Sequence, residues 1–358
     1  MNSLAGSKSR FESWLHQKLG DELVAADLAE KNKLLSDSPF VFLRGCYWRW
    51  SEMIAEVCPD IMGAPLVLAV GDIHLENFGT WRDAEGRLVW GVNDFDEAAE
   101  MPYGIDLVRL ATSVALSEDM RKGHLNESCA AILKGYQEGL TKPEPIILER
   151  DWQWLREAVV VAEDRRQKFW KKLDTRVVEE VSPRFRNALT AAMPEGATEL
   201  EIARRFAGTG SLGRPRWAGV ANWKGGEIAR EAKAVLPSAW AYAHGKADAP
   251  SRCADIANGT YRAPDPWYAV NDGIVVRRLS PNNRKVEVEQ RADFLLTADM
   301  HSVMGRELAN IHIGTAGASA AAIGDDIKSR KRKWLVSAAE DAAKAVTAEY
   351  KQWKKLYR

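Results

Sequence analysis

Polar side chains follow a short apolar segment near residue 70, and this feature constrains the fold of the chain more than any other. The segment Leu66–Val70 is short and apolar throughout, which predicts a buried β-strand. It ends at Gly71, and the residues that follow carry the polar side chains Asp72, His74, Glu76 and Asn77. Asp and Asn also favour ordinary turns, but a dense polar cluster at the end of a buried strand indicates a functional loop.

A second polar cluster ends the next pair of predicted strands. Phe78–Trp81 and Leu88–Val92 flank a predicted turn at residues 83–86, so we expect a β-hairpin. The second of these strands runs into the sequence Asn93-Asp94-Phe95-Asp96-Glu97. A hairpin would bring this cluster close to the first one.

The spacing of the two clusters matches a known way of transferring phosphoryl groups. Asn77 lies five positions after Asp72, as in a kinase catalytic loop, and Asp94 lies seventeen positions further on. Asp72 would orient or deprotonate the acceptor hydroxyl. Asn77 and Asp94 would ligate Mg²⁺, which prefers hard oxygen ligands. Asp96 is either a further metal ligand or a solvated neighbour of Asp94.

These motifs resemble a known family. The sequences GDIHLENFG at residues 71–79 and NDFDE at residues 93–97, with FLRG at residues 42–45, are similar to the bacterial domain-of-unknown-function family 2252. That family is grouped with kinase-like phosphotransferases, and the Gly-Asp-x-His-x-x-Asn core is also similar to aminoglycoside and choline phosphotransferases. The resemblance runs from about residue 39 to about residue 314. It implies a kinase-like fold, with ATP and Mg²⁺ as cofactors.

A glycine-rich segment is the second candidate site. Gly208, Gly210 and Gly213 form a G-x-G-x-x-G pattern around Ser211, which is a weak signal alone. In a dinucleotide-binding unit the glycines open a helix, and Glu231 has the spacing of the ribose-binding acid. In a kinase they lie in a hairpin over the phosphates. The strand-like segment after residue 215 favours the kinase arrangement, and a plain surface turn is the remaining alternative.

A basic residue on a later strand completes a kinase phosphate site. The resemblance places a Lys-Glu-Ala triplet there, and this chain has Arg230-Glu231-Ala232. Arg230 keeps the charge with a different geometry, and Lys233 is the alternative. The candidate cofactor-binding residues are therefore Gly208, Gly210, Ser211, Gly213, Arg230 and Lys233.

The order of these motifs is reversed relative to ordinary kinases, because the glycine-rich segment follows the acidic motifs. Residues 304–312 resemble the Leu-Ala-x-x-His helix that precedes the catalytic loop in aminoglycoside phosphotransferases. We therefore expect an α+β, two-lobed, kinase-like fold that is circularly permuted and has additional helices. The expected parts are an N-terminal helical extension (1–35), a catalytic part (36–196), a glycine-rich β-sheet part (197–290) and C-terminal helices packed on the catalytic part (291–358).

Five further predictions concern single residues or short segments. Phe40–Leu43 is an apolar run that reads as a short strand, and Ser182-Pro183 has the signature of a helix start. Asp106 can serve as the N-cap of a helix, and the resemblance alternatively implies that it braces the catalytic loop. Of the remaining polar residues, His74 is expected to form hydrogen bonds within its loop rather than to have a chemical role. Arg44 is expected to be a counter-ion of the acidic site, with a phosphate contact as the alternative.

Composition limits the function further. The 358 residues carry no net charge, which argues against a globally basic nucleic-acid binder. Four scattered cysteines, no signal-peptide-like N-terminus and no long apolar run predict a cytoplasmic protein that is not in a membrane. The six histidines do not cluster, which argues against a dinuclear metallophosphoesterase, although that class also begins its motif with Gly-Asp-x-His.

The sequence thus predicts an ATP- and Mg²⁺-dependent phosphotransferase that acts on a hydroxyl group of an unidentified acceptor. The alternative is a pseudokinase that binds nucleotide or a partner protein, and Arg230 in the usual lysine position is the feature that favours it. The acceptor and the oligomeric state do not follow from the sequence.

Overall fold

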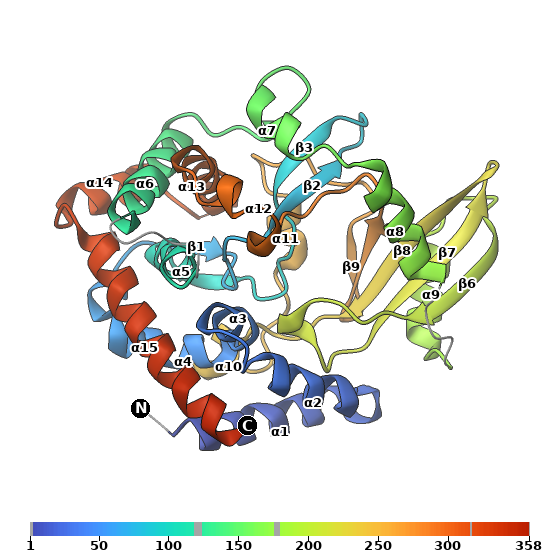
Figure 1. Ribbon diagram of the computed structural model, residues 1–358, viewed down its shortest axis with the longest axis horizontal. Coiled ribbons are helices and arrows are strands. Elements are labelled where there is room, and N and C mark those ends of the chain that lie inside the picture. Colours follow the sequence, from blue (N-terminus) through green and yellow to red (C-terminus); the bar gives the residue numbers. More distant parts are fainter. Residues whose placement is uncertain (1–2, 118–123, 175–179, 316, 358) are drawn as a thin grey trace.

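The computed structural model describes residues 3–117, 124–174, 180–315 and 317–357. Within these ranges the chain has a mixed α+β architecture with several small sheets. The largest of these sheets has five strands. It lies at one end of the molecule, with a group of long helices at the other, as Figure 1 shows. The two ends of the chain lie on the same side, where Lys8 Nζ sits 5.4 Å from the ring centroid of Tyr357.

The chain begins with helices that cover one side of the molecule. They are α1 (Leu4–Leu19), α2 (Ala25–Leu34), α3 (Pro39–Gly45) and α4 (Tyr47–Val57), with the 3₁₀ turns η1 (Gly20–Glu22) and η2 (Pro59–Ile61). The prediction of a strand at Phe40–Leu43 is wrong, because these residues lie in α3. Ser38 accepts a hydrogen bond from the backbone N–H of Val41, and Pro39 occupies the first turn, which together start a helix.

Two small sheets carry the acidic motifs. The strand β1 (Leu66–Ala69) pairs antiparallel with β4 (Ala99–Pro102). The predicted hairpin is present as β2 (Phe78–Arg82) and β3 (Leu88–Val92), and β3 also pairs with β5 (Ile146–Ile147). The residues after β1 and those after β3 therefore belong to two separate sheet edges.

Long helices pack beside these sheets. They are α5 (Gly104–Ala115), α6 (Leu125–Thr141), α13 (Ala298–Ile313), α14 (Ala320–Ser329) and α15 (Trp334–Leu356). The closest contact joins α6 to α13, where glycines let the two backbones touch. A Cβ on Gly135 would lie 1.8 Å from the carbonyl oxygen of Ser302, and one on Gly305 would lie 2.1 Å from that of Ile132.

The five-stranded sheet follows a helical connection formed by α7 (Gln153–Ala158), α8 (Glu163–Asp174) and α9 (Pro183–Ala191). The prediction that Ser182-Pro183 starts a helix is confirmed by α9. The strands are β6 (Thr198–Arg204), β7 (Arg216–Trp223), β8 (Gly226–Ala234), β9 (Ala269–Asn271) and β10 (Ile274–Leu279). Their spatial order is β6-β7-β8-β10-β9 and each neighbouring pair is antiparallel.

Short helices join the sheet to the rest of the molecule. The segment between β8 and β9 contains α10 (Ala239–Ala243) and α11 (Cys253–Ala257), and α12 (Val288–Leu295) follows β10. The segment before α12 runs along the hairpin, where Lys285 forms an antiparallel bridge with Gly79. In the described part of the chain, no helix is both long enough and apolar enough to span a membrane.

The close packing of α6 on α13 leads to a stability prediction. We expect Gly305→Ala to lower the free energy of unfolding by about 1–3 kcal/mol or more, because the added methyl group forces two backbones apart. The control is Gly324→Ala on α14, where a Cβ meets no atom within 4 Å and where alanine should add roughly 0.5–1 kcal/mol. Urea unfolding of both variants gives the comparison, and equal stabilities would contradict the packing argument.

Candidate functional site

The first acidic motif is held by a buried carboxylate. Asp106 is fully buried in the first turn of α5, and it accepts hydrogen bonds from the backbone N–H groups of Val70 (2.7 Å) and Gly71 (2.9 Å). His312 Nε2 on α13 lies 3.0 Å from the same carboxylate. Because α5 begins at Gly104, Asp106 is not the helix N-cap. Asp106 instead braces the loop that follows β1, as the resemblance implied.

The loop turns at a position that only glycine tolerates. Gly71 has a φ of +79°, and a Cβ there would lie 2.5 Å from the carbonyl oxygen of Glu97 and 2.6 Å from Tyr47 Oη. The backbone of the first acidic motif therefore touches that of the second.

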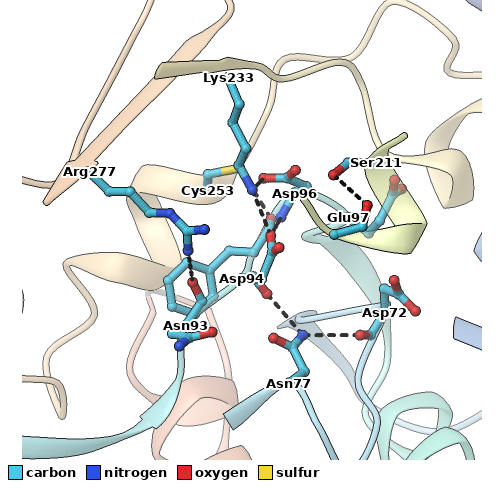
Figure 2. A network of polar contacts seen from close by, with 12 residues as sticks. Asp72, Asn77, Asn93, Asp94, Asp96, Glu97, Ser211, Lys233, Cys253 and Arg277 are labelled. Carbon is cyan, nitrogen blue, oxygen red and sulfur yellow. Dashed lines mark hydrogen bonds and ion pairs between the residues drawn. The ribbon is translucent and has the colours of Figure 1, made fainter. Parts of the chain in front are cut away.

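Asn77 ties the two motifs together. Its side-chain amide donates to the carbonyl oxygens of Asp72 and Asp94, at 3.1 Å each, as Figure 2 shows. The predicted proximity of the two clusters is thereby confirmed. The other amide atom, Oδ1, is buried and accepts no hydrogen bond from any described residue.

The second motif receives a lysine from the five-stranded sheet. Lys233 Nζ lies 3.0 Å from Asp94 Oδ1 and 2.7 Å from Asp96 Oδ1 (Figure 2). Burial alone would raise the pKa of Asp94, but the charges of Lys233, Arg277 and Arg216 outweigh it and hold that pKa well below its usual range. Asp94 is therefore ionised at every physiological pH.

Lys233, not Arg230, is the basic residue that the fold brings to the acidic motifs. The guanidinium of Arg230 stacks on Trp267, 4.3 Å from its ring centroid, and donates to the carbonyl oxygen of Ala192. Side chains of a strand alternate between faces, so Glu231 and Lys233 share one face of β8 and Arg230 points to the other. The alternation of side chains along the strand could be read from the sequence. The match of residues 230–232 to the Lys-Glu-Ala triplet of the family nevertheless favoured Arg230.

Glu231 organises a cluster of arginines that sequence reasoning missed. This fully buried carboxylate pairs with Arg205, with Arg216 at 3.0 Å and with Arg277 at 2.8 Å. Burial, reinforced by repulsion from Arg277, lowers the pKa of Arg216 to about 10. Three guanidinium groups around one carboxylate give this cluster a net positive charge.

Asp72 also has a cationic partner that was not predicted. Arg109 on α5 donates to Asp72 Oδ1, and its fully buried guanidinium lies between the rings of Tyr47 and Trp50. Burial raises the pKa of Asp72, with Arg109 opposing the shift and Asp94 adding to it. Arg109 follows Asp106 by three residues, so one face of α5 supports both the loop and the candidate base.

The glycine-rich segment closes over these residues. It connects the antiparallel strands β6 and β7 through the 3₁₀ turn η3 (Thr209–Ser211), so the dinucleotide-binding alternative, in which it opens a helix, is wrong. Gly208, Gly210 and Ser211 line one cavity with Asp72, Asn77 and Asp94. A Cβ on Gly210 would lie 3.4 Å from Asp72 Oδ2. Gly213 instead packs against Leu28 of α2.

The cavity is small. Its volume is about 70 Å³, and since one water needs about 10–15 Å³ by this measure, it holds roughly five water molecules. It therefore admits a small anion as it stands.

Two other predicted roles agree with the geometry. His74 Nδ1 accepts a hydrogen bond from the backbone N–H of Glu76 at 3.1 Å. Burial and the nearby charge of Arg44 hold the pKa of His74 well below its usual range, so this ring is a neutral member of the loop. Arg44 pairs with Glu76 at 2.6 Å and is a counter-ion, as predicted.

The oxygens at the junction of the motifs suit a hard metal ion. Asn77 Oδ1 is buried without a hydrogen bond, and the buried carboxylate of Asp96 has only its ion pair with Lys233 among the described residues. In those residues no three His, Cys, Asp or Glu side chains converge as a metal site. Mg²⁺ needs fewer, since it is usually held by one or two carboxylates together with waters and substrate phosphates. The donor set of Asn77, Asp94 and Asp96 fits that ion.

The chain matches the family described as "Uncharacterized protein conserved in bacteria (DUF2252)" over residues 23–201 and 197–356. It therefore belongs to this family, as its motifs predicted. Neither the curated proteins nor the solved structures that were searched contain a match.

The lowered pKa of Asp94 predicts an acid-dependent loss of stability. The unfolded-state pKa of an Asp is about 3.9, and the folded-state value is lower, so the stabilising contribution is present above that pH and is lost as pH falls below about 4. The melting temperature of the wild type should drop more steeply between pH 5 and pH 3 than that of Asp94→Asn.

Solvent screening makes this acid-dependent loss of stability smaller, because the Asp94 side chain is 38% exposed. Asp325→Asn, a change at a surface pair with Lys328, serves as the control and should follow the wild type. Parallel melting curves for Asp94→Asn and the wild type across this range would contradict the assignment.

Proposed function

We propose that the protein is a kinase-like phosphotransferase that moves the γ-phosphoryl group of ATP to a hydroxyl group of an acceptor, with Mg²⁺. The observation that carries the proposal is the convergence of three distant segments on one site. Asp72 and Asn77 come from the loop after β1, Asp94 from the end of β3, and Lys233 from β8 (Figure 2). The glycine-rich turn lines the same cavity.

The arrangement supports a kinase-like assignment residue by residue. In protein kinases a glycine-rich loop covers the phosphates, a lysine stands on the third strand of the sheet, and an Asp and an Asn hold the metal. Here the glycine-rich turn joins the first two strands of the five-stranded sheet, and Lys233 is on the third. Asp94 is followed by Phe95, as in the Asp-Phe-Gly motif of kinases.

The contacts also support a circular permutation. His312, near the end of α13, contacts Asp106 directly beside the catalytic loop, although more than 200 residues separate them in the sequence. The two ends of the chain lie close together, as Lys8 and Tyr357 show. A permuted order of catalytic part, glycine-rich sheet and connecting helix needs only such neighbouring ends.

Each residue then has a defined task. Arg109 holds Asp72 Oδ1, which leaves Oδ2 at the cavity to accept the proton of the acceptor hydroxyl. The raised pKa of Asp72 favours this transfer. Asn77 and Asp94, with Asp96 beside them, would hold Mg²⁺, which neutralises charge on the transferring phosphoryl group. Lys233, which pairs with Asp94, and the arginine cluster around Glu231 supply fixed positive charge beside the second acidic motif.

A pseudokinase is the alternative function. It was favoured by Arg230 in the position of the usual lysine, but Lys233 stands beside Asp94 and Arg230 is stacked on Trp267. The arginine at position 230, where the family has lysine, therefore gives no reason to expect an inactive protein. We place the protein in the cytoplasm, because ATP is its proposed donor and all four cysteines are free and buried.

Thermal unfolding with ATP, with and without Mg²⁺, tests the proposal. A ligand at a hundredfold excess over its Kd adds about 2.7 kcal/mol to the free energy of unfolding. The wild type should show a shift that requires Mg²⁺, and Asp94→Asn should lose it. Asp72→Asn should keep the shift and lose transfer, because Asp72 contacts the acceptor rather than the nucleotide. A wild type that gains no stability from any nucleotide would refute the proposal and favour a protein-binding pseudokinase.

Lys233 and Arg230 make a matched pair for testing the phosphate site. Lys233→Met should lower ATP turnover by roughly 100-fold or more, since it removes a preorganised charge from the transferring group. Arg230→Met loses a cation of the same strand but on the opposite face, and its turnover should stay within a few-fold of wild type. Equal losses in both variants, measured by release of ADP, would mean that the charge acts through the sheet and not at the site.

A further inference from the structure

The N-terminal helices reach into the site through one buried lysine. Lys31 lies on α2 with 6% of its surface exposed, and its Nζ donates to the carbonyl oxygen of Gly210 at 2.6 Å. It lines the same cavity as Asp72 and Arg214. Two further contacts hold α2 over the glycine-rich turn, a hydrogen bond from the Val24 N–H to the Gly213 carbonyl oxygen and an ion pair between Asp27 and Arg204.

Lys31 differs from the arginines of the cavity in having no counter-ion. Arg44 pairs with Glu76, and Arg214 pairs with Glu97 at 2.9 Å. No described carboxylate lies within ion-pair distance of Lys31, and its ammonium group donates to a neutral carbonyl group. A buried ammonium group without a directly paired carboxylate is destabilising. An anion in the cavity would remove this cost.

The charge state of Lys31 agrees with such a role. Burial lowers its pKa to about 8, with Arg214 also lowering it and Cys46 and Asp72 raising it. The group is therefore largely protonated at neutral pH. Gly210 occupies one of its three N–H donors, which leaves two for a ligand. Lys285 also lines the cavity, and although part of its side chain is exposed, burial of its ammonium group lowers its pKa to about 8 as well. Lys31 is distinguished from it by its direct hydrogen bond to the glycine-rich turn.

We propose that Lys31 is a phosphate-binding residue, which the N-terminal helices contribute to the cavity between the glycine-rich turn and Asp72. The ligand is a tetrahedral oxyanion. Resting on the proposed function, we identify it as the terminal phosphate of the nucleotide, which lies next to Asp72 during transfer. The N-terminal helices are then part of the active site, not a separate extension.

Calorimetric titration of the full chain with Mg²⁺ and either a non-hydrolysable ATP analogue or ADP tests the inference. Lys31→Gln should weaken binding of the analogue at least tenfold and that of ADP less than threefold, because ADP lacks the phosphate that Lys31 contacts. Lys33→Gln is the control on the same helix, where the side chain is 73% exposed and pairs with Glu30. It should bind both nucleotides like the wild type. Unchanged affinities in Lys31→Gln, or equal losses for both nucleotides, would overturn the inference.

A second variant separates phosphate binding from the clamping of the turn. Arg204→Gln breaks the ion pair with Asp27 and loosens α2 while leaving the Lys31 charge in place. If Arg204→Gln loses the analogue as Lys31→Gln does, Lys31 acts only by holding the turn and the inference fails. Preserved binding in Arg204→Gln supports a direct contact.

Sulfate distinguishes this inference from the proposed function. If the wild type binds neither nucleotide, the proposed function fails. Thermal unfolding with sodium sulfate at matched ionic strength then tests whether Lys31 forms an oxyanion site. The general stabilisation by sulfate is common to all variants. A further stabilisation of the wild type and of Lys33→Gln that Lys31→Gln lacks supports an oxyanion site without a nucleotide. The same sulfate response in all three proteins would overturn it.

Discussion

The site depends on the buried carboxylate of Asp106. It accepts two backbone N–H groups at the end of β1 and contacts His312 on α13, and His312 Nδ1 in turn lies 2.8 Å from the hydroxyl of Tyr136 on α6. Hydrogen bonds to a charged group contribute about 1.5–3 kcal/mol each, and a buried partner left without one costs as much. One polar chain thus joins a strand and three helices. Because Asp72 follows this anchored backbone directly, its position is set by the core and not by a flexible loop.

A second constraint is the balance of charge behind the cavity. The second acidic motif lines the cavity, and Lys233 pairs with it and belongs to the same sheet as the arginines around Glu231. In a low-dielectric environment neither the acidic nor the basic group is stable alone, so the five-stranded sheet and the acidic loops hold each other in place. The same balance explains why Asp94 stays ionised although it is partly buried. A site of this kind is prepared for an anion and a metal ion before either one binds.

Much of this arrangement could be predicted from local patterns. The hairpin, the proximity of Asn77 to Asp94 and the helix start at Ser182-Pro183 all follow from turn residues and spacing, and all are present. The prediction of a strand at Phe40–Leu43 was wrong because it followed the apolar run and not the helix-start signal that precedes it. Ser38-Pro39 carries the same helix-start signal as Ser182-Pro183, but a short apolar run has no periodicity that separates strand from helix.

What the sequence by itself determined is the family, the two acidic motifs and the glycine-rich segment, because each is a local pattern whose chemistry depends on residue type and spacing. The tertiary structure decided which cations lie beside them, including the choice between Arg230 and Lys233 that the sequence left open. Lys233 faces Asp94 because of its phase on β8, Arg109 reaches Asp72 from α5, and Lys31 reaches Gly210 across 179 positions of the sequence. Such contacts join segments whose order and distance along the chain carry no signal, so only the packed fold reveals them.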